Sequence, residues 1–216
     1  MTLIFFHIEK SGGTSLQYLF RQIYGDKFYQ YHINHEEKCR EELQQMHIKP
    51  LVVHGHMTYG VHEVLDKGYQ YLTVLRDPYE RYLSHYYHIK TREKEGVAFS
   101  IEDFMETCPQ CHNLLVRRLV GKVFNPITEQ DVEMAFQRLS LFKHIGFMDN
   151  FRGFAQNLMG TYCWGECHLE QKNGSGCLKE FTKFDAPLIK KIYETNIYDV
   201  QLYHKIRGRN WDSIVN

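Results

Sequence analysis

The stretch FFHIEKSGGTSL, residues 5–16, decides the fold of this chain. The residues before its turn, 3–6, are apolar and β-prone, which predicts a short buried strand. After the turn, apolar residues recur at helical spacing as far as Ile23, with Thr14 or Ser15 placed to cap the helix. The stretch therefore predicts a strand, a glycine-rich turn and a helix N-terminus in direct succession.

A turn of this kind can bind an anion. The N–H groups and the dipole of the helix start point at one place, and glycine lets a ligand approach the backbone closely. Lysine adds a full positive charge, so we predict a phosphate site; an ordinary capped turn is the alternative. The predicted phosphate-binding residues are Lys10, Ser11, Gly12, Gly13, Thr14 and Ser15.

The order of residues in this turn is not that of a Walker A motif, which places its lysine after the second glycine. Asp77 follows a predicted strand, but Arg76 stands between them and would disfavour Mg²⁺ nearby. A P-loop kinase or NTPase needs that metal for its phosphoryl charge. Such an enzyme is therefore the less favoured alternative.

Strand and helix patterns alternate along the chain. Strand patterns cover 3–8, 28–33, 51–54, 69–75 and 144–148, and helical patterns cover 14–24, 35–47, 61–67, 78–94, 101–106, 111–120, 132–139, 151–158 and about 187–207. This alternation predicts an α/β fold, a P-loop-like parallel sheet flanked by helices on both faces. The strandless stretch at roughly 95–142 predicts a helical insertion, and 216 residues are typical of one domain.

A second motif, TVLRDPYERYLSHYYH at 73–88, repeats the strand-to-helix pattern. Asp77 can cap the helix and Pro78 fits its first turn. Ligands of parallel sheets bind beyond the carboxyl ends of the strands. We therefore predict that Arg76 and Ser84 reach a second phosphate. Arg81 by itself is expected to pair with Asp77 or Glu80 on a solvated helix face.

Together the two motifs resemble the cofactor signatures of the sulfotransferase 2 family, which includes heparan sulfate 2-O-sulfotransferase and many bacterial members. The first family signature reads approximately HIPKTGGTS, and this chain has Glu9 for proline and Ser11 for threonine. The second, R-D-P-x-x-R-x-x-S, is matched from Arg76 to Ser84. Further similarities are HGHMTYG at 54–60, HNLLVRRLVG at 112–121, HIGFMDNF at 144–151 and LYHKI at 202–206.

The resemblance implies sulfuryl transfer from 3′-phosphoadenosine 5′-phosphosulfate (PAPS) to a hydroxyl of an acceptor, expected to be a carbohydrate or a small molecule. The product would be adenosine 3′,5′-bisphosphate (PAP), and no metal is expected. In this interpretation the Lys10 loop holds the 5′-phosphosulfate, Lys10 stabilises the developing charge, and Arg76 with Ser84 holds the 3′-phosphate.

The resemblance also indicates a general base and residues on the acceptor side. His56 matches the histidine of the family's Gly-His pair, which is assigned the role of general base, and it lies just past a predicted strand end. Glu9 is the competing base, although it is expected to pair with a neighbouring cation. Asn113 and Arg117 match the segment N-x-x-x-R-x-L-x-G and are expected to line the acceptor side; a helix docked through an Arg–carboxylate pair is equally compatible.

Composition limits the remaining classes of function. Twenty-six basic residues balance 26 acidic ones, so no nucleic-acid partner is expected. We find no leader pattern and no apolar run of membrane length, so a cytoplasmic protein without a membrane partner is expected. A catalytically decayed nucleotide-binding module is disfavoured because Lys10, His56, Arg76 and Ser84 are all present.

Six cysteines leave their own chemistry open. Cys108 and Cys111 have the spacing of zinc ligands, and Cys163, Cys167, His168 and Cys177 cluster later. A structural zinc site or a disulfide is compatible with these spacings. Free thiols are the default in the cytosol.

Overall fold

The computed structural model describes residues 1–66, 68–91, 99–165, 169 and 184–208. The strands are β1 (Thr2–Phe6), β2 (Phe28–His32), β3 (Val52–His56), β4 (Tyr69–Leu75) and β5 (His144–Phe147). The α-helices are α1 (Gly13–Tyr24), α2 (Glu36–Gln45), α3 (Pro78–Lys90), α4 (Ile101–Thr107), α5 (Leu114–Val120), α6 (Glu129–Ser140), α7 (Phe151–Thr161), α8 (Ala186–Thr195) and α9 (Ile197–Ile206).

The chain divides into two compact units. The first contains Met1–Leu75 and Arg138–Gly174, and the second contains Arg76–Gln137 and Ser175–Asn216. Helix α6 runs across the boundary between them. The single sulfotransferase domain expected over 1–216 stays a prediction.

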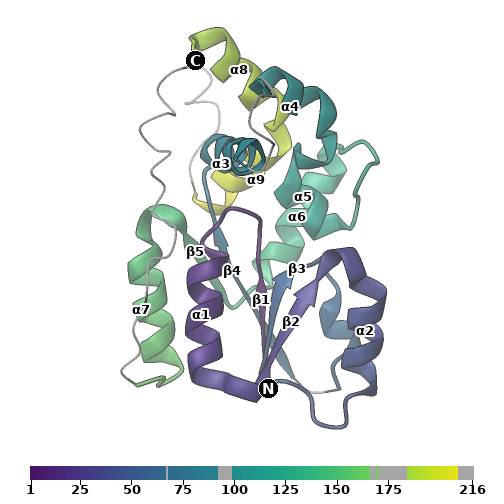
Figure 1. The fold of residues 1–216 in the computed structure, drawn as a ribbon, viewed down its shortest axis with the longest axis vertical. Coiled ribbons are helices and arrows are strands. Elements are labelled where there is room, and N and C mark those ends of the chain that lie inside the picture. The colour runs from purple at the N-terminus through teal and green to yellow at the C-terminus, as the bar shows by residue number, and fades with distance from the viewer. Residues whose placement is uncertain (67, 92–98, 166–168, 170–183, 209–216) are drawn as a thin grey trace. The chain divides into compact units, whose positions relative to one another are not determined.

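A parallel five-stranded sheet forms the centre of the first unit, in the order β2-β3-β1-β4-β5 (Figure 1). Successive side chains of β1 point to opposite faces, as a strand requires. Leu3 and Phe5 face the apolar cluster formed with α1 and α7. Phe6 packs edge-on against Tyr71 and Phe142 instead. Both sheet faces are therefore buried, which explains why the strands read as continuous apolar runs.

Helices make up the described part of the second unit. Tyr82, Leu83 and Tyr86 of α3 form an apolar cluster with Phe104 of α4 and Ile192 of α8. Helices α4, α5 and α6 lie within the stretch where a helical insertion was predicted. The α/β fold, the parallel sheet and the insertion are thus confirmed.

Two helix predictions were wrong. The pattern at 61–67 gives only a short 3-10 turn, Val61–Val64, within the described residues. The single helix expected over 187–207 is two helices, α8 and α9, separated at Asn196. Asn196 is buried, and its side-chain oxygen accepts hydrogen bonds from the Asn113 N–H (3.2 Å) and from Arg81 (3.4 Å). A buried amide with these partners fixes the break, which periodicity does not reveal.

None of the helices in the described ranges combines the length and the apolar composition that crossing a membrane requires.

Candidate functional site

The loop between β1 and α1 has an unusual backbone. Lys10 has φ 67° and Gly12 has φ 73°, both in the left-handed region. The Ser11 N–H donates to the Ile8 carbonyl at 3.2 Å, which closes the turn. Gly12 is the N-cap of α1, so the prediction that Thr14 or Ser15 caps the helix was wrong. A lysine in the left-handed backbone region is strained, and such backbone strain is typical of functional loops.

Packing requires both glycines of this loop. A Cβ on Gly13 would lie 1.9 Å from Nε2 of His7, and a Cβ on Gly12 would lie 2.8 Å from the Phe151 ring. Neither position can therefore accept a side chain without moving a packed ring. The chain thus enters α1 directly over His7, and the first-turn N–H groups of α1 begin at this point.

Three histidine rings lie together beside the loop. His54 is buried, and its Nε2 donates to the Gly13 carbonyl at 3.1 Å. The His7 ring lies 5.3 Å from that of His54 and stacks on that of His56 at 4.3 Å, measured between centroids. Burial lowers the pKa of His54 to about 3 and holds the pKa of His7 well below its usual value, and the Lys10 charge acts on His7 in the same direction. Both rings are therefore neutral at neutral pH.

His56 stands at the exposed end of this stack and is the last residue of β3. Its Nδ1 lies 3.0 Å from the His7 carbonyl oxygen. A carbonyl can only accept, so Nδ1 carries a proton and, in the neutral ring, Nε2 is the nitrogen with the lone pair. The His56 side chain is 38% exposed. The protein thus orients the imidazole so that Nε2 is the ring nitrogen available for proton transfer.

Glu9 completes this arrangement. Its Oε2 lies 3.8 Å from His56 Nδ1, and its side chain is only 14% exposed. A carboxylate at this distance favours the protonated imidazole that would form during proton transfer. Glu9 was expected to pair with a neighbouring cation, and protonated His56 would be such a partner. Sequence spacing could not reveal this pair, because it depends on β3 lying beside β1.

A cavity of about 530 Å³ opens beside His56 within the first unit. Its lining residues come from the end of β1, from α1, and from β2 and β3: His7, Thr14, Gln17, Arg21, Gln30, Tyr31, His32, His54, Gly55 and His56. Thr14 therefore belongs both to the predicted phosphate loop and to the cavity wall. Ser11 differs, because its side chain is buried and its N–H is already bonded.

Arg76 and Ser84 lie in the second unit. Arg76 follows β4 directly, its side chain is 8% exposed, and its Nε donates to Glu80 Oε2 at 3.3 Å. Asp77 caps α3 by accepting from the N–H groups of Tyr79 (3.0 Å) and Glu80 (3.2 Å), as predicted. Ser84 is a half-buried residue of α3, two turns from the helix start.

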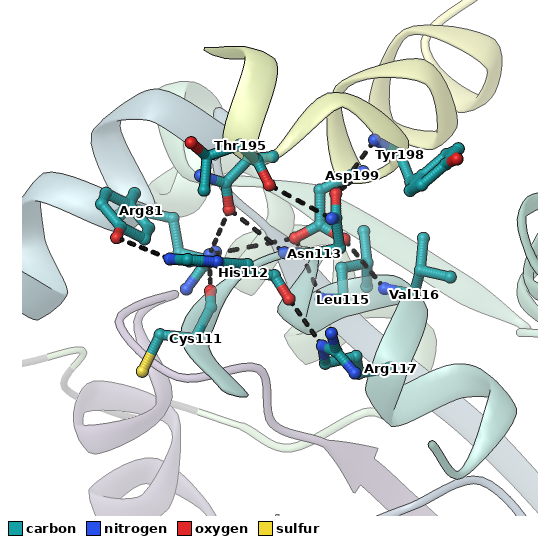
Figure 2. A network of polar contacts seen from close by, with 12 residues as sticks. Arg81, Cys111, His112, Asn113, Leu115, Val116, Arg117, Thr195, Tyr198 and Asp199 are labelled. Carbon is teal, nitrogen blue, oxygen red and sulfur yellow. Dashed lines mark hydrogen bonds and ion pairs between the residues drawn. The ribbon is translucent and has the colours of Figure 1, made fainter. Parts of the chain in front are cut away.

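The prediction for Arg81 was wrong. Its guanidinium is buried, and Nη2 donates to the Cys111 carbonyl at 2.9 Å and lies 3.9 Å from Asp199 Oδ2. Burial raises the pKa of Asp199, whereas the charge of Arg81 lowers it. Asp199 also accepts from the N–H groups of Leu115 (3.0 Å) and Val116 (2.9 Å), so it caps α5 (Figure 2).

Asn113 belongs to the same polar cluster, at the junction of α5 and α9. Its Oδ1 accepts from the N–H groups of Tyr198 (2.9 Å) and Asp199 (3.2 Å), and its Nδ2 donates to the Thr195 carbonyl at 3.2 Å (Figure 2). Asn113 itself has φ 50° and is 8% exposed. Its amide therefore joins α5 to the start of α9, and its expected contact with an acceptor stays a prediction.

Arg117 closes the loop that follows α5. Its Nε donates to the His112 carbonyl at 2.8 Å, and Nη1 donates to the carbonyls of Val123 (3.0 Å) and Asn125 (2.8 Å). These bonds hold the backbone on both sides of the helix. These contacts are consistent with the docked-helix alternative, although the buried Arg–carboxylate pair at this junction is Arg81–Asp199.

The cysteines within the described ranges are free thiols, namely Cys39, Cys108, Cys111 and Cys163. No group of three or more potential ligands for a metal ion is found among the described residues. Cys167, His168 and Cys177 lie outside them, so the zinc and disulfide alternatives for the later cluster stay open.

The fold has counterparts among solved structures. A sulfotransferase from Alicyclobacillus acidocaldarius superposes with a TM-score of 0.56 at 12% identity, covering 99% of this chain and 98% of that one. The mouse sulfotransferase SULT7A1, crystallised in complex with PAP, gives a TM-score of 0.47 at 14% identity over 93% of this chain and 64% of that one. No curated protein sequence matches the chain.

The sequence itself matches the profile of the sulfotransferase family over residues 1–141. The matched region contains the Lys10 loop, His56 and the motif from Arg76 to Ser84. The chain belongs to the sulfotransferase family.

Proposed function

We propose that this sulfotransferase uses PAPS as its donor and His56 as the general base that activates the acceptor hydroxyl. The observation that carries the proposal is the contact between His56 Nδ1 and the His7 carbonyl. Its Nδ1–H is bound to the His7 carbonyl at 3.0 Å, which leaves Nε2 to accept a proton on an exposed side chain. Family membership supports sulfuryl transfer, and the geometry supports this nitrogen as the proton acceptor.

The loop before α1 fits the phosphosulfate end of such a donor. PAPS supplies an activated sulfuryl group attached to a phosphate. The left-handed turn at Lys10 and Gly12 leads directly into the first turn of α1, whose N–H groups favour an anion. We assign Lys10, Gly12, Gly13, Thr14 and Ser15 to this end. In this structure Ser11 closes the turn, so its contribution would be to loop shape.

Arg76 and Ser84 are assigned to the 3′-phosphate. The assignment rests on the family signature that they match, since the two units of the chain are described separately. A guanidinium and a hydroxyl are suitable partners for a phosphate. Arg76 is held by Glu80 in this structure, so phosphate binding would require Arg76 to share or exchange that partner.

The proton and the leaving charge would then be handled by different residues. As the acceptor oxygen bonds to sulfur, His56 Nε2 takes the hydroxyl proton, and the nearby Glu9 carboxylate stabilises the resulting imidazolium. Lys10 and the loop N–H groups stabilise the charge that develops on the bridging oxygen of the leaving phosphate. Glu9 replaces a proline of the family signature, so this electrostatic support is a feature of the present chain.

The acceptor is proposed to be a carbohydrate on the resemblance to carbohydrate sulfotransferases. An assay with ³⁵S-labelled PAPS and a fractionated lysate tests the reaction even while the identity of the acceptor is open. We expect label in a product whose mass has increased by one SO₃ group, together with PAP. Label recovered only as inorganic sulfate with every fraction would contradict the transfer reaction.

A further inference from the structure

The cavity beside His56 extends along helix α1. Thr14, Gln17 and Arg21 of α1 line it at positions i, i+3 and i+7, which share one helix face. Helix α1 starts at the carboxyl edge of the sheet and runs back along it, so Arg21 lies about 10 Å from Thr14 along the helix axis. The strands give the same direction, since the His32–His56 pair ends β2 and β3 and the Gln30–His54 pair lies two residues earlier. His56 is thus at one end and Arg21 toward the other.

The cavity wall is polar, and its fixed charge is positive. Arg21 is the only lysine or arginine among the lining residues that the structure describes, and no aspartate or glutamate is among them. The guanidinium of Arg21 lies over the Phe28 ring at 4.4 Å from the centroid, which positions it without neutralising it. Within the described ranges, Arg21 makes no ion pair with a carboxylate.

Amide groups add hydrogen-bonding capacity between these ends. Gln17 Nε2 donates to Gln30 Oε1 at 2.6 Å, and Gln30 Nε2 donates to the His54 carbonyl at 3.1 Å. The amides are therefore held in place, and the side-chain oxygen of Gln17 is left to accept from a ligand. A volume of about 530 Å³ lies within the range of small-molecule sites.

We propose that this cavity is the acceptor site, and that Arg21 selects an acceptor carrying one anionic group at the end remote from the reacting hydroxyl. The inference rests on the proposed role of His56, because that role fixes which end of the cavity receives the hydroxyl. One fixed cation matches one anionic group rather than charge repeated along a polymer. The selectivity is therefore for an elongated monoanion, and the rise of about 10 Å from Thr14 to Arg21 along α1 corresponds to about two sugar rings.

Calorimetric binding to three saccharide probes tests this inference apart from catalysis. Cellobiouronic acid has its carboxylate two rings from its far hydroxyls, cellobiose lacks the carboxylate, and glucuronic acid is too short. We expect the wild-type protein to bind cellobiouronic acid at least about tenfold more tightly than either other probe, as a charge-assisted contact predicts. Arg21→Gln should remove that preference, and Arg21→Lys should keep part of it. Arg152→Gln, on the exposed face of α7 and outside the cavity, should leave it unchanged.

Equal affinity of the wild-type protein for the acid and for cellobiose would overturn the inference. So would an undiminished preference in Arg21→Gln, or failure of cellobiouronic acid to bind at millimolar concentration. PAP binding measured on the same samples reports on the proposed donor separately. A protein that binds the acid through Arg21 but does not bind PAP would refute the donor assignment and leave the anion selectivity standing.

Discussion

Two polar regions of this chain both contain residues that match family motifs, but they differ in structure. The loop from His7 to Ser15 binds Nδ1 of the partly exposed His56 through a backbone carbonyl and holds a lysine in a left-handed conformation. The junction of α5 and α9 directs its polar groups inward, since Asn113, Arg81 and Asp199 bind the backbone or one another. The first arrangement is suited to chemistry, and the second stabilises the fold.

The difference shows what a matched family motif can mean. Arg81 lies between Arg76 and Ser84 in the same signature, yet it is buried at 2% exposure against an aspartate from the far end of the chain. Asn113 and Arg117 likewise match the family and bind backbone groups. A residue in a signature can therefore support the architecture rather than the reaction, and substitution effects should separate the two classes.

The largest expected effect concerns His56. His56→Ala should lower turnover by roughly 10²–10⁴-fold, the usual range for removal of a general base. PAP affinity should barely change, because the proton comes from the acceptor. His47→Ala, an exposed histidine of the same unit, is the control. Near-normal turnover in His56→Ala with inactive Glu9→Gln would move the base to Glu9.

Next in size is the effect of breaking the buried pair in the junction. Asp199→Ala leaves Arg81 as an uncompensated buried charge and removes the acceptors for two N–H groups of α5. We expect the free energy of unfolding in urea to fall by about 3–5 kcal/mol. Glu194→Ala, at an exposed site on α8, should cost far less. A loss below about 1 kcal/mol for Asp199→Ala would contradict the structural role of the junction.

Acid should destabilise the histidine stack. Because burial lowers the pKa of His54 from its ordinary value to about 3, the unfolded state binds more protons below about pH 6.5. The contribution of neutral His54 to the free energy of unfolding is therefore fully present above that pH. It is lost as the pH falls toward 3, at up to about 1.4 kcal/mol per pH unit. Urea unfolding at neutral and at mildly acidic pH should show a shallower pH dependence for His54→Gln than for the wild type. Identical slopes would show that His54 is not buried as a neutral ring.

The smallest stability effect should have the opposite sign. Lys10→Gly removes a non-glycine residue from φ 67°, so we expect the protein to become more stable by about 1 kcal/mol. The same change should reduce turnover and weaken donor binding, because the charge at the phosphate loop is lost. Lys38→Gly, at an exposed position in α2, should instead be destabilising, by about 1 kcal/mol. Destabilisation by Lys10→Gly would indicate that Lys10 supports the fold.

The sequence predicts much of this fold because the strands are short apolar runs and the loop glycines are local signals. All five predicted strands are present, and Asp77 caps α3 as its position suggested. The junction could not be predicted, because Arg81 meets Asn196 across 115 residues and Asn113 meets Asp199 across 86. The Glu9–His56 pair was missed because it depends on the strand order. Local patterns find elements and loops, whereas buried polar partners depend on tertiary contacts.

The donor assignment is tested most directly by thermal unfolding with PAP, compared with ATP plus Mg²⁺. A ligand at about a hundred times its Kd stabilises a protein by about 2.7 kcal/mol, which is a clear rise in Tm. We predict that PAP raises the Tm of the wild-type protein, that the rise is smaller for Lys10→Gly, and that ATP with Mg²⁺ gives little change. A rise with ATP and Mg²⁺ but none with PAP would contradict the account.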